Sequence, residues 1–329
     1  MDTGRYDVTL AVLNNARPFF QITNPGVKLV DLHIANVRKS LFAILKLAKQ
    51  IRPSIILTTA NHLNLYLAIF KWMFPKNIKI IARESSIVSV NTDRAPLPWL
   101  YHWLLRKFYK NIDLIICQSD YMRSDLAKNY KMPAEKMQII YNAVAIPEVN
   151  TSDKTETSPA KLITVARLSK EKGIDRLIRA VSLLKIPYHF TIVGEGDQRA
   201  ALQDQINASS LQQHISLAGG NEKPFTIVPN PDLFLMGSYY EGFPNAMLEA
   251  VAAGIPVVAF NAPGGIAELL VNNENGFLVP DDDVTAFAAA IEKALDHSFD
   301  KEKIKQITAQ RFNINAVMQK WYKVFDGSR

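Results

Sequence analysis

Short apolar runs alternate with longer amphipathic stretches along the first half of the chain. The runs, which predict buried strands, cover residues 6–13, 26–32, 54–58, 78–82 and 113–118. Residues 37–51 and 64–74 carry apolar side chains at helical spacing and predict helices. Strands that alternate with helices require crossover connections, so we expect this half to form a parallel sheet.

The same alternation restarts after residues 150–160, a polar stretch without periodicity that predicts a linker. Further strands are expected at residues 162–166, 189–193, 215–218, 233–236, 256–260 and 276–279. Helices are expected at residues 173–184, 245–254 and 314–325. The predicted fold class is therefore α/β, with two Rossmann-like, doubly wound domains at residues 1–150 and 151–311 that face a central cleft, followed by a C-terminal helical segment at 312–329.

Composition supports a globular protein and narrows its class. The chain has 329 residues, of which 48% are hydrophobic and 21% charged, so it can bury two cores. Its single cysteine, Cys117, excludes a disulfide scaffold and a cysteine-based zinc site. No secretory signal opens the chain, and no apolar segment reaches the roughly 20 residues of a membrane span. We expect a cytoplasmic protein.

Charge is distributed unevenly between the two halves. Residues 1–150 carry 20 Lys and Arg against 10 Asp and Glu, whereas residues 151–329 carry 18 against 21. A basic first half favours an anionic partner, such as nucleic acid, a phospholipid surface or a phosphorylated substrate. The second half holds most of the glycines, since only Gly4 and Gly26 of 14 precede residue 150.

Two loops of the second half could approach a phosphate group. In A-R-L-S-K-E-K-G, Arg167 and Lys172 follow a predicted strand and could hold a diphosphate, although a solvated loop explains them as well. In V-G-E-G-D, Gly194 and Gly196 permit close approach of the backbone to a ligand, or simply form a tight turn.

A third loop, Y-Y-E-G-F-P-N-A-M-L-E-A, leads from a strand into a helix. A turn at Gly242, Phe243 and Pro244 would direct free amides of the helix start at an anion. A carboxylate does not bind an anion favourably, but it accepts hydrogen bonds from neutral hydroxyls. Glu241 therefore suits the hydroxyl groups of a sugar, and Glu249 those of a ribose. Two glutamates eight residues apart also occur by chance.

Six motifs in order make the second half resemble the retaining glycosyltransferases of family 4. They run from residue 162 to 280: the A-R-L loop, V-G-x-G, E-G-F-P-N-x-x-L-E-A, A-x-G-x-P-V-V, G-G-x-x-E and N-G-F-L-V-P. The resemblance implies the GT-B fold, a nucleotide-diphosphate sugar as donor substrate, transfer with retention, and neither a metal nor another cofactor. It also implies that the last helix crosses back to the first domain.

The resemblance implies a role for each matched position. Arg167 and Lys172 would hold the diphosphate, Glu241 would contact the transferred sugar, and Glu249 the ribose. The remaining donor-binding positions would be Gly194, Gly196, Gly242, Phe243, Pro244, Asn245, Ala246 and Leu248. In the first half, Glu84 of A-R-E-S-S follows a strand, and we expect it to face the cleft as a fourth catalytic residue, or to be part of a charged loop.

Residues 94–110 interleave aromatic rings with cations. The segment mixes the rings of Trp99, Tyr101, Trp103, Phe108 and Tyr109 with the cations of Arg106, Lys107 and Lys110 at helical spacing, which suits an anionic membrane surface. The alternative is a core helix with buried rings. No nucleic-acid-binding motif is present, so we expect no nucleic-acid partner.

The first half departs from the family pattern at its start. Family members open with a strand and a glycine-rich loop before the strand that matches residues 6–13, so we expect either a truncated chain or a first domain without its central strand. The function expected is transfer of a sugar from a nucleotide-diphosphate sugar, with UDP as the expected nucleotide, to a lipid-linked or polysaccharide acceptor in cell-envelope glycan synthesis. The alternatives are a catalytically impaired nucleotide-sugar-binding protein and a nucleotide-sugar epimerase.

Overall fold

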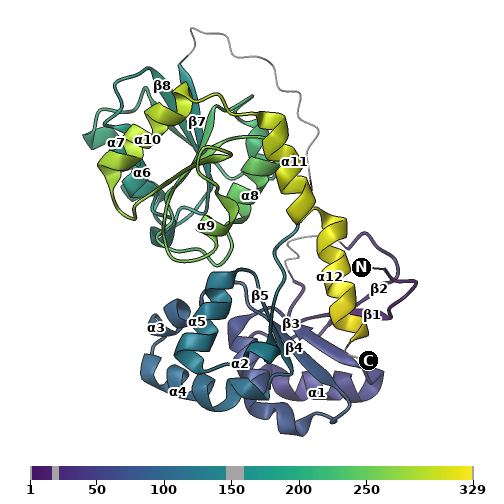
Figure 1. Ribbon diagram of the computed structural model, residues 1–329. Helices are drawn as coiled ribbons and strands as arrows, with labels where there is room; N and C mark the ends of the chain where they lie inside the picture. Colours follow the sequence, from purple (N-terminus) through teal and green to yellow (C-terminus); the bar gives the residue numbers. More distant parts are fainter. Residues whose placement is uncertain (1, 17–21, 146–158, 328–329) are drawn as a thin grey trace. The chain divides into compact units, whose positions relative to one another are not determined.

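The computed structural model describes residues 2–16, 22–145 and 159–327, and the chain divides into two compact units (Figure 1). Unit 1 consists of Met1–Cys117, Arg123–Ile140 and Met318–Arg329. Unit 2 consists of Gln118–Met122 and Tyr141–Val317.

Unit 2 is built on a parallel sheet whose strand order reverses in the middle. Its strands are β7 (Ala160–Val165), β8 (Tyr188–Val193), β9 (Ile215–Gly219), β10 (Leu233–Met236), β11 (Val257–Phe260) and β12 (Gly276–Val279). They lie in the order β12-β11-β10-β7-β8-β9. The chain moves outward from β7 to β9, returns to the middle at β10 and moves outward again to β12. The reversal therefore lies between β7 and β10, where ligands bind in open α/β sheets.

Helices cover both faces of this sheet (Figure 1). One face packs against α6 (Ile174–Val181), α7 (Arg199–Ala208) and α10 (Val284–Asp296). The other packs against α8 (Asn245–Ala252), α9 (Ile266–Leu269) and α11 (Lys301–Phe312). Neighbouring strand residues such as Leu162 and Ile163 belong to different cores, because successive side chains of a strand point to opposite faces.

Unit 1 contains a four-stranded parallel sheet in the order β3-β4-β5-β6. These strands are β3 (Ile55–Thr58), β4 (Lys79–Arg83), β5 (Leu114–Cys117) and β6 (Met137–Ile139). The helices are α1 (Ser40–Ile51), α2 (Asn61–Phe70), α3 (Val88–Asp93), α4 (Pro98–Phe108) and α5 (Asp120–Tyr130), whose first residues belong to unit 2. Short 3₁₀ turns occur in both units, at Val37–Lys39, Lys71–Met73, Tyr109–Asn111, Ala134–Lys136, Lys170–Lys172 and Pro224–Thr226.

A second, two-stranded parallel sheet lies in unit 1. β1 (Val8–Val12) pairs with β2 (Val27–Asp31), and the described residues include no strand that joins this pair to β3. Parallel strands normally lie in sheets that are buried on both faces. Here Leu29 of β2 is 45% exposed, and Leu57 of β3, in the four-stranded sheet, is 40% exposed. The strands expected in the first half thus form two parallel sheets instead of one.

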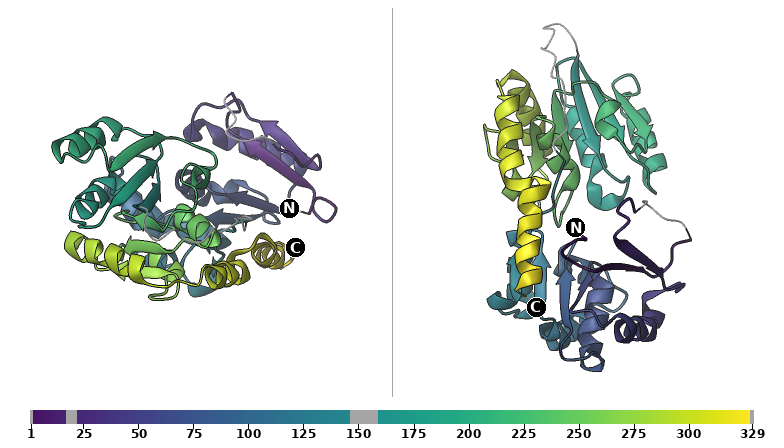
Figure 2. Two further views of the ribbon diagram at one scale, coloured as in Figure 1. Left: turned by 90° about the horizontal axis from the view of Figure 1, so that it is seen from above. Right: turned by 90° about the vertical axis from the view of Figure 1, so that its right-hand side faces the viewer.

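The last helix, α12 (Ile314–Asp326), continues from unit 2 into unit 1 and meets the start of the chain there (Figure 2). The rings of Tyr6 and Tyr322 stack with their centroids 5.7 Å apart. The hydroxyl of Tyr6 donates a hydrogen bond of 2.8 Å to Asp326, which also pairs with Arg5. The first strand segment is thereby attached to the end of the chain.

The prediction of an α/β fold with parallel sheets is confirmed, and each strand and helix expected by range corresponds to an observed element. The ranges missed by the pattern were mainly helices, including α5, α7, α10 and α11. The linker expected at residues 150–160 lies, up to residue 158, outside the described residues.

A buried polar network lies at the carboxyl end of β4. Glu84 is fully buried, and its Oε1 accepts hydrogen bonds from the Tyr109 hydroxyl and, at 2.7 Å, from Asn64 Nδ2. Its Oε2 is buried with no partner among the described residues. The carboxyl group lines a cavity of about 30 Å³, which has room for about one water molecule, together with Asn61 and Asn91.

The environment of Glu84 changes its titration. Burial raises the pKa of this carboxyl from 4.5 to about 7, against the hydrogen bond from Asn64, which lowers it, while the negative charge of Asp125 raises it further. The folded protein thus holds a proton over a pH range in which the unfolded chain has released it.

This difference predicts that the protein becomes less stable as the pH rises from about 4.5 to 7, and that stability then stays level with respect to this group. We expect the loss to be on the order of 3 kcal/mol. Glu84→Gln keeps an acceptor for Tyr109 and Asn64 but cannot ionise, so its stability should not show this decline. Urea unfolding at several pH values measures the effect, with exposed Glu135→Gln as control. Parallel pH profiles for the wild type and Glu84→Gln would contradict the assignment.

Candidate functional site

Most of the residues singled out in the second half lie at one edge of the unit 2 sheet. Loops at the carboxyl ends of β7, β8, β10 and β11 carry them, and these four strands are neighbours in the order β11-β10-β7-β8. The reversal of strand order falls within this group, so the loops diverge around a single point.

Lys172 and Glu241 meet across the reversal. Lys172 lies on the loop after β7 and donates a hydrogen bond of 2.6 Å to Oε1 of Glu241, on the loop after β10. Both side chains are largely buried, with 22% and 10% of their surfaces exposed. The Ser238 hydroxyl donates to the same oxygen at 2.7 Å. The predicted pair is thus brought together from 69 residues apart, and Ser238 fixes the carboxylate from the other side.

Gly194 and Gly196 lie against main-chain carbonyls of the loop after β7. A Cβ at Gly194 would stand 1.8 Å from the carbonyl oxygen of Ala166, and one at Gly196 would stand 2.2 Å from that of Leu168. The Leu168 amide also donates to the Glu195 carbonyl at 2.9 Å. The two glycines therefore allow the loops after β7 and β8 to run side by side, which places Arg167 and Lys172 at the edge of the sheet.

A similar contact joins the loops after β10 and β11. The Glu241 amide donates to the Pro263 carbonyl at 2.9 Å, and the Gly265 amide donates to the Glu241 carbonyl at 3.2 Å. Gly264 has a φ of +125°, and a Cβ there would lie 1.5 Å from the Glu241 carbonyl oxygen. Only glycine fits this approach, so the G-G pair holds the backbone of Glu241 in place.

Arg167 is the exposed cation of the site, with 71% of its side chain accessible. Its guanidinium lies 3.4 Å from Glu171. Burial raises the pKa of Glu171, but the hydrogen bond from Ser169 and the charges of Arg167 and Lys172 outweigh this and lower it. Glu171 is therefore ionised and orients Arg167 without covering it.

Helix α8 begins beside Glu241 and directs its N-terminus to the same edge. No side chain of the described residues caps its first turn, which leaves N–H groups for an anion. Asn245 and Glu249, one turn apart, are both exposed. The surrounding protein partly desolvates the Glu249 carboxyl and raises its pKa, although the residue as a whole is exposed.

Several predicted donor-binding positions contribute backbone rather than side chains. Phe243 is 4% exposed and packs on Tyr141 and Phe312, and Gly242 and Pro244 are also buried. Ala246 is half-buried. Leu248 has its side chain in the core, and its amide donates to the Pro244 carbonyl. It therefore has neither a side chain nor an N–H to offer a ligand.

Glu84 belongs to unit 1, whereas Arg167, Lys172 and Glu241 belong to unit 2. It follows a strand, as expected, but its side chain faces the cavity within unit 1 and has no exposed surface. Its role as a fourth catalytic residue stays a prediction.

The site offers two kinds of group to a ligand. Arg167, Lys172 and the start of α8 can stabilise an anion, while the carboxylates of Glu241 and Glu249 can accept hydrogen bonds from neutral hydroxyls. This combination fits an anion joined to polyhydroxylated groups. No set of three or more His, Cys, Asp or Glu side chains in the described ranges is arranged to hold a metal ion. No described helix is long and apolar enough to cross a bilayer.

Sequence comparison covers both units. Residues 146–311 match the family "Glycosyl transferases group 1", and residues 4–146 match "Glycosyltransferase Family 4". One curated relative is N-acetylgalactosamine-N,N'-diacetylbacillosaminyl-diphospho-undecaprenol 4-alpha-N-acetylgalactosaminyltransferase of Campylobacter jejuni. It is 27% identical over 234 residues, which cover 70% of this chain and 64% of the relative. The chain thus matches less than two thirds of that relative's length.

Solved structures share the fold at low sequence identity. The apo form of the lipopolysaccharide outer core galactosyltransferase WaaB has a TM-score of 0.77 and 18% identity, covering 93% of this chain and 85% of its own. Anabaena HepE in complex with UDP-glucose has a TM-score of 0.72 and 21% identity, covering 87% and 81%. These neighbours and the two parallel sheet units identify the fold as GT-B. The chain belongs to the group 1 glycosyltransferases, the family that its six motifs resemble.

Proposed function

We propose that this protein is a retaining glycosyltransferase that moves a sugar from a UDP-sugar to a lipid-linked or polysaccharide acceptor in cell-envelope glycan synthesis. The observation that carries the proposal is the cluster at the strand reversal of unit 2. It combines the Lys172–Glu241 pair, the exposed Arg167 and the uncapped start of α8. A nucleotide-diphosphate sugar supplies both the anion and the hydroxyl groups that this cluster suits.

The named relatives support the finer parts of the proposal. HepE holds UDP-glucose, which favours a uridine nucleotide. The Campylobacter relative acts on a diphospho-undecaprenol, and WaaB is a lipopolysaccharide galactosyltransferase, so both favour a lipid-linked glycan as acceptor.

The mechanism follows from where charge develops. As the bond between the sugar and the diphosphate breaks, negative charge accumulates on the leaving diphosphate. The acceptor hydroxyl attacks from the face that the nucleotide leaves, and its proton passes to the departing diphosphate oxygen. Arg167 and Lys172 stabilise this charge more in the transition state than in the ground state. Glu241 accepts hydrogen bonds from hydroxyls of the transferred sugar, and Glu249 from those of the ribose.

Replacing Arg167 tests the catalytic part of this proposal. Because the side chain is exposed and its polar partner among the described residues is Glu171, at 3.4 Å, Arg167→Ala should leave stability unchanged. It should lower the transfer rate by about 10²–10³, as expected for the loss of one preorganised donor. Transfer of labelled sugar to lipid-linked and polysaccharide acceptors measures the rate, with Arg179→Ala on α6 as control. Wild-type turnover in Arg167→Ala would contradict the mechanism, and UDP binding without any transfer would favour the binding-protein alternative.

A surface on α4 favours a membrane as the location of the acceptor. Trp99 is 69% and Trp103 50% exposed, and Lys107 Nζ lies 4.7 Å from the centroid of the Trp103 ring. Leu105 and Tyr109 are buried, so one side of this segment packs in unit 1 while the other presents rings and cations. The buried residues agree with the core-helix alternative, while the membrane-surface alternative stays a prediction that concerns the exposed ones. We propose that the exposed side binds anionic lipid.

Salt dependence tests this membrane contact. Binding to vesicles that contain phosphatidylglycerol should weaken strongly between about 0.1 M and about 1 M salt, over which the Debye length falls from about 10 to about 3 Å. Trp103→Ala should weaken binding further, whereas Phe42→Ala, which removes an exposed ring from α1, should not. Sedimentation with vesicles measures both effects. Equal binding to neutral phosphatidylcholine vesicles would exclude an electrostatic contact.

A further inference from the structure

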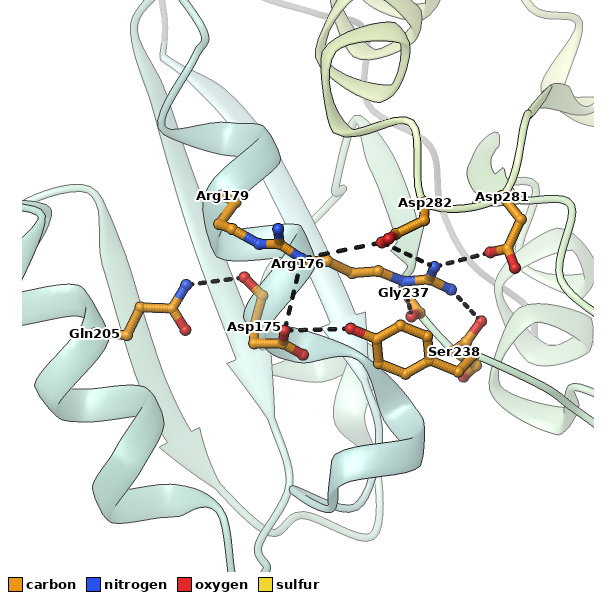
Figure 3. Close-up of polar contacts among 9 residues, drawn as sticks. Asp175, Arg176, Arg179, Gln205, Gly237, Ser238, Asp281 and Asp282 are labelled. Atoms are coloured by element: carbon orange, nitrogen blue, oxygen red, sulfur yellow. Dashed lines mark hydrogen bonds and ion pairs between the residues drawn. The ribbon is translucent and has the colours of Figure 1, made fainter.

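Arg176 is a charged side chain with no exposed surface. It lies on α6, with main-chain carbonyls and acidic side chains around its guanidinium (Figure 3). The guanidinium also lies over the rings of Tyr239 and Phe260, whose centroids are 4.1 and 4.0 Å away. Burying a guanidinium is costly unless its donors are paired, so the acceptors around it indicate what it does.

Two of these acceptors are consecutive main-chain carbonyls. Nε donates to the Gly237 oxygen at 2.6 Å, and Nη2 donates to the Ser238 oxygen at 2.5 Å. The remaining nitrogen, Nη1, donates to the Asp281 carboxylate at 2.8 Å. A planar guanidinium fixes two neighbouring carbonyls in one orientation, which an ammonium group cannot do.

The carbonyls belong to the segment that carries Glu241. Within it, the Ser238 hydroxyl donates to Glu241 Oε1, and the Tyr239 amide donates to the Glu171 carbonyl at 2.9 Å. Gly237 also touches the loop that carries Lys172, since a Cβ on Gly173 would lie 1.9 Å from the Gly237 oxygen. Arg176 therefore holds the backbone between β10 and Glu241 against the loop after β7.

We propose that Arg176 is a positioning residue for the donor site. It sets the orientation of Ser238, and through Ser238 the distance between Glu241 and Lys172, without contacting the substrate. The expected effect of Arg176 on catalysis rests on the proposed function, whereas its expected effect on the backbone near Glu241 does not. The family motifs gave no indication of it, because Arg176 lies outside each of them.

The kinetic test compares two variants with a matched control. Arg176→Met removes all donors, whereas Arg176→Lys keeps the charge but loses the planar fork. We expect kcat to fall about 10²-fold in Arg176→Met and about tenfold in Arg176→Lys, as for a small misplacement of reacting groups. The KM for the donor should change by less than about threefold, because Arg176 does not touch it. Arg179→Met makes the same replacement one turn along α6, where the ion pairs span 3.8 and 4.0 Å, and should keep wild-type kcat.

The structural test needs no activity. Amide hydrogen exchange at Tyr239 and Glu241, both hydrogen-bonded to neighbouring loops, should be about tenfold faster in Arg176→Lys than in the wild type and in Arg179→Met. Unchanged exchange at both amides in a folded Arg176→Lys would overturn the inference. If the wild type shows no transfer, the proposed function fails and this measurement still decides the role of Arg176.

Ser238→Ala covers the case in which neither Arg176 variant folds. It leaves the bonds of Arg176 to main-chain carbonyls intact and removes only the hydrogen bond to Glu241. A several-fold fall in kcat, or faster exchange at the Glu241 amide, would support transmission through Ser238. Wild-type values for both would overturn it.

Discussion

The ion pair between Lys172 and Glu241 joins the two halves of the unit 2 sheet at the point where its strand order reverses. Everything else in the candidate site is arranged around this contact. Glycines let the four neighbouring loops after β7, β8, β10 and β11 run close together, Ser238 orients the carboxylate, and Arg176 holds the backbone that leads to it. A parallel sheet with this reversal directs loops from both halves to one place, so the chemistry can be assembled from short, separate motifs.

Much of the fold was predictable because it depends on local patterns. Runs such as residues 162–166 are apolar on both faces, as a strand buried between two helical layers requires, and they correspond to β7. Helices with few apolar residues were harder to predict from the sequence. α11 has few apolar positions and is attached mainly through Ile304, Thr308 and Phe312, so its periodicity is weak in the sequence. The strand pattern did not show that the first sheet is divided, since strand pairing is a long-range property, and only the departure from the family pattern pointed to a missing central strand.

The site was predictable in its motifs but not in its contacts. Arg167, Lys172 and Glu241 were singled out, and they do lie on neighbouring loops. The sequence could not show that Gly194 and Gly196 approach the backbone of Ala166 and Leu168, a contact within the protein. Nor could it show that Arg176 is buried, because a single arginine on an amphipathic helix normally faces solvent. Glu84 likewise resembles a loop charge until Asn64 and Tyr109 are placed beside it.

Calorimetric titration of the full chain with UDP shows whether unit 2 binds a uridine nucleotide at this edge of its sheet, as we propose. We expect UDP to bind, GDP to bind more weakly, and Glu249→Ala to weaken UDP binding by about tenfold or more, as for a lost hydrogen bond to a charged group. Glu274→Ala, at the opposite edge near the start of β12, should bind like the wild type. No heat with either nucleotide, or equal affinity in Glu249→Ala and Glu274→Ala, would contradict a uridine nucleotide site at this edge.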